Sequence, residues 1–334
     1  MASNTKPNLP WKVTTTMSIL NAINNITGRS NGTINRRLLA IIDLKFPTSR
    51  NFKSNGVSSS DVIVDSTCNL WFRLFIPSST STIAATSLPV IIYFHGGGFA
   101  YMSPSSVLYH LFCRFLCRSF PAIVVSVNYR LTPEHRFPSQ NDDGLKILKF
   151  LDQNGDILGK YANINKCFLM GDSAGGNVVH HVAIQVAFEK LRVLKVIGLV
   201  SIQPFFGGEE RTESEIRLKW VPICSMDKTD WYLKMFLPDG SNRDHEAINV
   251  CGPNAMDISK VDYPNTLLFV GGFDPLVDWQ KRYYEWLRKS GKEVELIEYP
   301  NMIHAFFYFH DLPDTRHFIS KVKEFMIKQM VNMN

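Results

Sequence analysis

The chain has 334 residues, of which 45% are hydrophobic and 20% charged, a composition typical of a folded globular protein with a large core. Its formal net charge of +6 comes from 36 basic and 30 acidic residues scattered along the sequence, so we expect no nucleic-acid partner. No apolar run reaches membrane-spanning length and residues 1–10 lack the apolar core of a signal peptide, so we expect a cytoplasmic protein without a membrane partner.

The six cysteines stand apart from one another among apolar neighbours. Cys113 and Cys117 are four residues apart on a predicted helix, which could indicate a metal site. No second pair of cysteines or histidines at ligand spacing accompanies them, so we expect buried free thiols instead. The sequence therefore implies neither a metal nor an organic cofactor.

An N-terminal arm precedes every predicted strand. Apolar residues recur every three or four positions from Val13 to Ile26, which predicts a helix over 11–26, and a second short helix is expected over 36–43. We expect this arm, residues 1–45, either to pack passively on the core or to cover the mouth of a site as a helical lid.

Together with this arm, the rest of the chain is expected to form a single α/β domain over residues 1–334. Strands are expected at 61–64, 70–76, 90–94, 122–127, 167–170, 196–202, 266–270 and 294–298. Helices are expected at 106–118, 143–152, 174–190, 227–236, 278–289 and 315–330. The first two strands follow each other as in a hairpin, and the later ones alternate with helices. This order indicates a mostly parallel eight-stranded sheet with helices on both faces, and residues 205–257 offer material for a cap.

A pentapeptide, Gly171-Asp172-Ser173-Ala174-Gly175, joins the strand at 167–170 to the helix that follows it. In this context Gly-x-Ser-x-Gly is typical of a nucleophile elbow, a tight turn that lifts the serine hydroxyl above a sheet. Glycines suit the close packing of strand against helix. The alternative is an ordinary glycine-rich loop, so the assignment of Ser173 as a nucleophile depends on the rest of the chain.

A second glycine-rich segment, His95-Gly96-Gly97-Gly98, follows the strand at 90–94. Consecutive glycines expose backbone N–H groups, which an acyl-transfer enzyme needs where a carbonyl oxygen becomes an oxyanion. Phosphate binding is the alternative, but the segment matches neither Gly-x-Gly-x-x-Gly nor Gly-x-x-x-x-Gly-Lys. We therefore favour an oxyanion loop, with His95 orienting the loop and taking no part as a base.

A serine nucleophile requires a base and a carboxylate that orients the base. When the serine stands on an elbow of this kind, the acid and then the histidine follow it in the chain. Asp274 comes directly after the strand at 266–270, although it could also be a plain helix N-cap. Asp278 is a rival that falls within the next helix, so we favour Asp274. His304 is the histidine in the loop after the last strand, which makes Ser173, Asp274 and His304 the predicted triad.

These segments resemble the hormone-sensitive-lipase-like branch of the α/β hydrolases, and in particular plant carboxylesterases. The resemblance extends over nearly the whole chain, at residues 31–37, 95–99, 126–135, 171–177, 205–213 and 274–276. The first and fifth of these segments also resemble the gibberellin receptor, a non-hydrolytic relative with an N-terminal helical lid. In that receptor the catalytic histidine is replaced, whereas His304 is present here.

The resemblance implies that the amides of Gly97, Gly98 and Ala174 form the oxyanion hole, with Gly96 shaping the loop. It also implies that Asp172 and Asn177 position the elbow. Aromatic residues of the expected lid and cap suggest an apolar pocket, although several could simply belong to the core: Trp11, Phe99, Tyr101, Phe205, Phe206, Trp220 and Trp231.

The expected activity is that of a serine carboxylesterase acting on small to medium hydrophobic esters such as plant specialised metabolites. Two alternatives remain open at this point. Some relatives in alkaloid pathways couple ester loss to decarboxylation or cyclisation, and the gibberellin-receptor-like arm would suit a small-molecule receptor without turnover.

Overall fold

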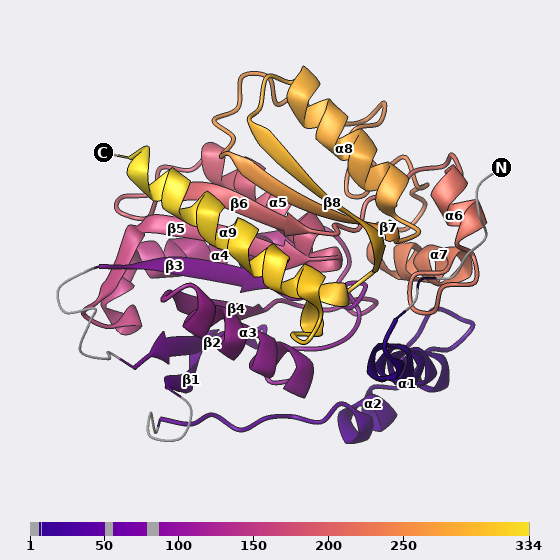
Figure 1. Ribbon diagram of the computed structural model, residues 1–334, viewed down its shortest axis with the longest axis horizontal. Coiled ribbons are helices and arrows are strands. Elements are labelled where there is room, and N and C mark those ends of the chain that lie inside the picture. The colour runs from indigo at the N-terminus through magenta and orange to yellow at the C-terminus, as the bar shows by residue number, and fades with distance from the viewer. Residues whose placement is uncertain (1–6, 8, 51–55, 79–86, 334) are drawn as a thin grey trace.

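A computed structural model describes residues 7, 9–50, 56–78 and 87–333 (Figure 1). Its strands are β1 Val57–Asp65, β2 Leu70–Pro77, β3 Leu88–Phe94, β4 Ile123–Asn128, β5 Ala162–Asp172, β6 Val196–Ile202, β7 Thr266–Phe273 and β8 Val294–Ile303. They form one eight-stranded sheet in the order β1-β2-β4-β3-β5-β6-β7-β8. β1 and β2 pair antiparallel with their neighbours, and the strands from β4 to β8 run parallel.

The helices are α1 Trp11–Thr27, α2 Arg36–Ile42, α3 Val107–Ser119, α4 Ser139–Gln153, α5 Ala174–Ala187, α6 Glu213–Arg217, α7 Met226–Phe236, α8 Val277–Lys289 and α9 Pro313–Val331. Short 3-10 helices occupy Gly155–Leu158 and Phe306–Tyr308. This architecture confirms the predicted α/β-hydrolase fold with N-terminal helices. The short α6 was not predicted, because five residues are too few for a helical pattern to be visible.

Two hydrophobic cores cover the two faces of the sheet. Successive side chains of a strand point to opposite faces, so Ile92 and Phe94 of β3 belong to one core and Ile91 and Tyr93 to the other. The first core contains side chains of α4, α5 and α8, and the second contains side chains of α3 and α9. Figure 1 shows α9 crossing the nearer face of the sheet, with α5 behind it. Burial on both faces explains the unbroken apolar strands.

The N-terminal arm lies against α7 rather than apart from the domain (Figure 1). The Asn24 side chain in α1 donates to the Tyr232 hydroxyl at 2.8 Å, and the Trp231 indole donates to the Arg29 carbonyl at 2.9 Å. Arg36 of α2 forms an ion pair with Glu134 at 2.6 Å. These bonds hold the arm at the carboxyl edge of the parallel strands, where the predicted site residues lie.

All six cysteines have free thiols, and Cys113 and Cys117 are buried on α3. No helix in the described part of the chain is both long and apolar enough to cross a membrane.

Candidate active site

Ser173 stands between β5 and α5 in a strained backbone conformation. Its φ of 53° and ψ of −119° are rarely adopted by a residue with a side chain. The neighbouring chain segments approach closely: a Cβ atom on Gly171 would lie 2.4 Å from the Gly175 carbonyl oxygen, and one on Gly175 would lie 2.0 Å from the Phe94 carbonyl oxygen. Only glycine fits at these two positions, so the turn has the geometry of a nucleophile elbow.

Asp274 and His304 form a buried pair beside this elbow. Asp274 follows β7 and His304 follows β8, and the Nδ1 atom of His304 lies 2.8 Å from Oδ2 of Asp274. The carboxylate of Asp274 also accepts hydrogen bonds from the Leu276 amide at 3.0 Å and from the Gln280 side chain at 2.9 Å. Asp278, the rival acid, instead accepts a bond from the Ser214 amide at 2.8 Å. The structure thus pairs Asp274, and not Asp278, with the histidine.

The pKa of His304 is raised well above its ordinary value. Burial by itself would lower the pKa, but the negative charge of Asp274 and a hydrogen-bonding contact with Cys224 outweigh that effect. Asp274 engages Nδ1, which leaves Nε2 as the ring nitrogen that can serve a second partner. His304 and Ser173 line the same cavity.

Two glutamines that the sequence analysis missed hold this pair in place. Gln203, after β6, donates to the Ile303 carbonyl at 3.1 Å and accepts from the Ala305 amide at 2.8 Å, so it clamps the backbone on both sides of His304. Gln280 in α8 is fully buried and bonds Asp274. A polar residue directly after an apolar strand was the available signal for Gln203; Gln280 had none.

The glycine loop after β3 lies against the same cavity. Gly97 and Gly98 line it and have φ values of 98° and 60°. In the described part of the chain, no protein acceptor takes a hydrogen bond from the amides of Gly97, Gly98 or Ala174. The Gly96 amide differs, because it donates to the Tyr109 hydroxyl at 2.7 Å and to Asp172 at 3.1 Å. Gly96 is therefore not available as an oxyanion donor, and its bonds suit the expected role of shaping the loop.

Asp172 is hydrogen-bonded to the glycine loop. Its carboxylate accepts hydrogen bonds from the hydroxyls of Tyr93 at 2.5 Å, Tyr109 at 3.0 Å and Tyr308 at 2.9 Å, in addition to the bond from Gly96. Burial raises the pKa of Asp172, while the tyrosine hydroxyls act against that effect. Because Asp172 directly precedes Ser173, these bonds couple the elbow to the glycine loop.

Asn177 lies in the first turn of α5, directly after the elbow. Its amide donates to the Phe205 carbonyl at 3.2 Å and to the Ala247 carbonyl at 2.8 Å. These bonds connect α5 to the segment between β6 and β7, where residues 205–257 were expected to form a cap.

The cavity at Ser173 is small, about 70 Å³, and lies between the arm, the glycine loop and α7. Leu20 of α1 and Tyr232 of α7 contribute to its walls. Of the seven aromatic residues expected there, Tyr101 and Phe205 line it. Trp11 and Trp220 are instead 72% and 44% exposed. Phe99 and Phe206 are instead buried in the core, in line with the alternative that several of the set belong there.

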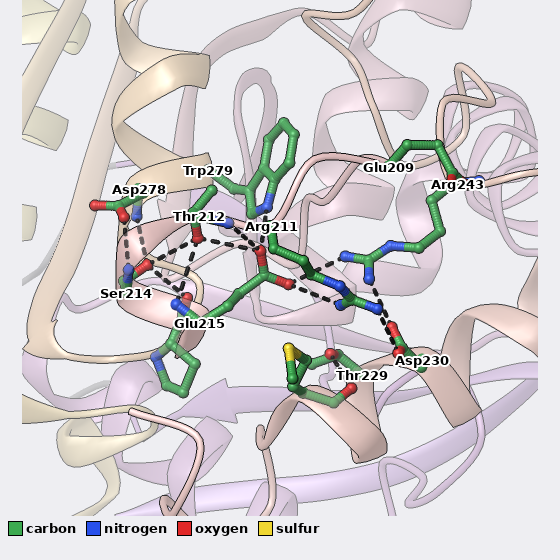
Figure 2. A network of polar contacts seen from close by, with 12 residues as sticks. Glu209, Arg211, Thr212, Ser214, Glu215, Thr229, Asp230, Arg243, Asp278 and Trp279 are labelled. Carbon is green, nitrogen blue, oxygen red and sulfur yellow. Dashed lines mark hydrogen bonds and ion pairs between the residues drawn. The ribbon is translucent and has the colours of Figure 1, made fainter. Parts of the chain in front are cut away.

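A network of charged and polar groups supports the wall formed by α7 (Figure 2). Arg211 and Arg243 both bind Asp230 of α7, at 2.5 and 2.6 Å, and both reach Glu215 of α6. Glu215 in turn accepts from the Trp279 indole of α8 at 3.1 Å. The network ties α6, α7 and α8 together, so the helix that carries Tyr232 is held relative to the helix that follows Asp274.

Gly98→Ala is expected to lower kcat for a short ester by roughly 100-fold. A Cβ atom at this position would lie 2.6 Å from the buried Tyr232 ring, so the loop or the ring must shift, and the expected loss comes from displacement of the loop amides. Gly240→Ala is the matched control, because Gly240 also has a positive φ, of 80°, but a Cβ there would meet nothing within 4 Å. Initial rates of both variants, with thermal unfolding as the folding check, separate loop displacement from backbone strain. Equal losses in both would contradict the expectation.

A family model described as the alpha/beta hydrolase fold matches residues 91–308. The chain belongs to the α/β-hydrolase family. The chain is 38% identical over 310 residues to the gibberellin receptor GID1C of Arabidopsis thaliana, with 90% of the chain and 88% of the receptor covered. It is also 38% identical over 249 residues to carboxylesterase 20 of the same plant, with 72% of the chain and 76% of the esterase covered.

The fold of the chain is also that of a solved esterase from Pyrobaculum calidifontis. The two superpose with a TM-score of 0.71 at 24% identity, over 98% of this chain and 95% of the esterase. The chain is thus similar both to receptors and to esterases, and overall similarity does not distinguish the two roles. The side chains around Ser173 provide the better criterion.

Proposed function

We propose that the protein is a serine carboxylesterase that hydrolyses small to medium hydrophobic esters through an acyl-enzyme. The observation that carries this proposal is the buried Asp274–His304 pair, 2.8 Å apart, whose histidine lines the same cavity as the strained Ser173. A base held by a carboxylate next to an elbow serine is the arrangement that activates a serine hydroxyl.

In the proposed mechanism, Nε2 of His304 accepts the Ser173 proton as Oγ attacks the ester carbonyl. Asp274 stabilises the imidazolium that forms, and the amides of Gly97, Gly98 and Ala174 donate to the oxyanion. His304 then gives the proton to the departing alcohol. A water molecule, deprotonated by His304, attacks the acyl group on Ser173 and releases the acid.

The chemistry of the cavity favours a neutral ester. Among the described residues that line it there is no lysine or arginine, and its surface is mainly apolar. An anionic ligand would find only His304 as a cationic partner, whereas an uncharged ester needs none. A hydrophobic ester of a plant specialised metabolite meets these requirements.

A second candidate is a small-molecule receptor without turnover, because the chain is 38% identical to both GID1C and carboxylesterase 20, and the match to GID1C covers more of the chain. The pairing of His304 with Asp274 speaks against it, since a receptor does not need an activated nucleophile.

The test combines covalent labelling with a substrate screen. A fluorophosphonate probe is expected to label the wild type on the peptide that contains Ser173, and p-nitrophenyl butyrate is expected to be hydrolysed. Mass spectrometry of products from candidate alkaloid methyl esters would show whether decarboxylation or cyclisation follows hydrolysis. Tight gibberellin binding without labelling or turnover would overturn the proposal in favour of the receptor.

A further inference from the structure

A second cavity, of about 560 Å³, lies beneath the N-terminal arm between α1, α2 and α3. We call it the arm groove. Each of the three helices contributes side chains to its walls, among them Ile23 of α1, Ile42 of α2 and Leu111 of α3. The arm groove is adjacent to the cavity at Ser173, because both are bordered by Leu20, Asn24, Tyr101, Met102, Leu108 and Tyr308.

The cavity at Ser173 cannot hold a medium-sized ester by itself. Its volume of about 70 Å³ is well below the roughly 300 Å³ at which pockets for such ligands begin. The carbonyl group and a small substituent fit there, so the remainder of a larger ester must extend elsewhere. The arm groove is adjacent and has the required volume.

The boundary between the two cavities is formed in part by flexible aliphatic side chains. Leu20, Met102 and Leu108 are only partly buried, so none of them is locked inside a core. Methionine and leucine change rotamer at low cost, and methionine adapts to irregular surfaces. Rotation of these side chains would connect the groove with Ser173 without movement of the backbone.

The lining of the arm groove indicates the chemistry of its occupant. Its surface is mainly apolar, and apart from two tyrosines its only described acidic or basic residues are Asp43 and His310. Asp43 is already engaged, because its carboxylate accepts from Lys45 at 2.5 Å and from Ser106 at 2.8 Å. An uncharged hydrocarbon chain or ring system therefore suits the groove better than a polar or charged group.

We propose that the arm groove is a substrate subsite, which receives the apolar tail of an elongated ester whose carbonyl lies at Ser173. This inference rests on the proposed esterase function and adds to it a preference for esters with a long apolar group. The tail can belong either to the acid or to the alcohol, and substrates extended on one side at a time distinguish the two.

The test uses a blocked groove. Leu111 lines the arm groove but not the cavity at Ser173, and Leu111→Trp would fill the groove from the side of α3. The substrates are p-nitrophenyl esters from acetyl to dodecanoyl and acetate esters of alcohols of increasing length. For the series whose tail enters the groove, kcat/KM of the long members is expected to fall roughly 10- to 100-fold. Turnover of p-nitrophenyl acetate is expected to stay within about twofold of the wild type.

Two further variants serve as an independent repeat and as a control. Ile42→Trp narrows the same groove from α2 and is expected to reproduce the effect, so a folding defect in one variant does not decide the outcome. Ile327→Trp on α9 is the control, because Ile327 is exposed and lines neither cavity. Unchanged chain-length profiles in folded Leu111→Trp and Ile42→Trp proteins would overturn the subsite.

A binding measurement separates this inference from the esterase proposal. Nile red, an uncharged apolar dye, is expected to bind the wild type and to bind Leu111→Trp roughly 10-fold more weakly. If no ester is hydrolysed but the dye distinguishes the two proteins, the esterase proposal fails while the apolar site stands. Equal dye binding by both proteins would reject the groove as a ligand site.

Discussion

Ser173→Ala is expected to lower kcat for p-nitrophenyl butyrate by roughly 10⁴- to 10⁶-fold. The variant lacks the only oxygen that can form the acyl-enzyme at the elbow, whereas the glycine loop and the Asp274–His304 pair remain. Any residual rate would come from attack by water at the oxyanion loop. The measurement is the initial rate at saturating substrate, together with fluorophosphonate labelling, which should disappear.

Ser320→Ala is the matched control for this prediction. Ser320 is an exposed serine of α9 whose hydroxyl bonds only to Glu324, at 3.0 Å, far along the chain from the elbow. It should retain both turnover and labelling. If Ser173→Ala keeps more than about a tenth of the wild-type rate, Ser173 is not the nucleophile.

Asp274→Asn is expected to lower kcat by roughly 10⁴-fold, the loss seen when a triad carboxylate becomes an amide. An asparagine cannot stabilise the imidazolium, and its N–H₂ group can hold His304 in the wrong tautomer. The Gln280 and Leu276 bonds to position 274 would keep the side chain near its present place, so the effect should be on charge rather than on folding.

The same substitution has an expected direction in the pH profile. Asp274 raises the pKa of His304, and the histidine acts as a base only when it is neutral. Wild-type kcat/KM should therefore decline on the acidic side of this raised pKa, at a higher pH than for an ordinary histidine. Removal of the carboxylate lowers the pKa of His304. The acidic limb of the residual activity in Asp274→Asn should therefore move to lower pH, as measured between about pH 4 and pH 9.

Asp278→Asn provides the comparison, because Asp278 bonds to Ser214 and does not contact His304. It should change kcat by less than about 10-fold and leave the acidic limb in place. A large loss in Asp278→Asn with little loss in Asp274→Asn would reverse the assignment of the acid.

Most of the fold could be predicted because its signals are local. Each central strand is an apolar run of about the length a strand requires, and the positions of all eight strands were anticipated. Their ends were less well predicted: β5 continues to Asp172 and β8 to Ile303. Strand ends depend on whether a partner strand offers hydrogen bonds, and that partner is distant in the sequence.

The contacts around Ser173 were harder to predict than the turn that carries it. Gln203 and Gln280 were missed because their partners, Ile303 and Asp274, lie in other elements. Gly96 had been grouped with the oxyanion loop, but its amide is taken by Tyr109 and Asp172. These hydrogen bonds connect residues from 6 to 100 positions apart, so they leave no periodic pattern in the sequence.

The sequence by itself determined the fold class and the elbow at Ser173, because strand length, helical periodicity and glycine spacing are properties of short segments. It also placed Asp274 and His304 after their strands, where parallel strands bring their carboxyl ends to one edge. Only the tertiary structure decided that Asp274 rather than Asp278 pairs with His304, which walls enclose Ser173, and that a groove lies beneath the arm. Those features depend on side-chain directions and on contacts between distant elements, which packing alone establishes.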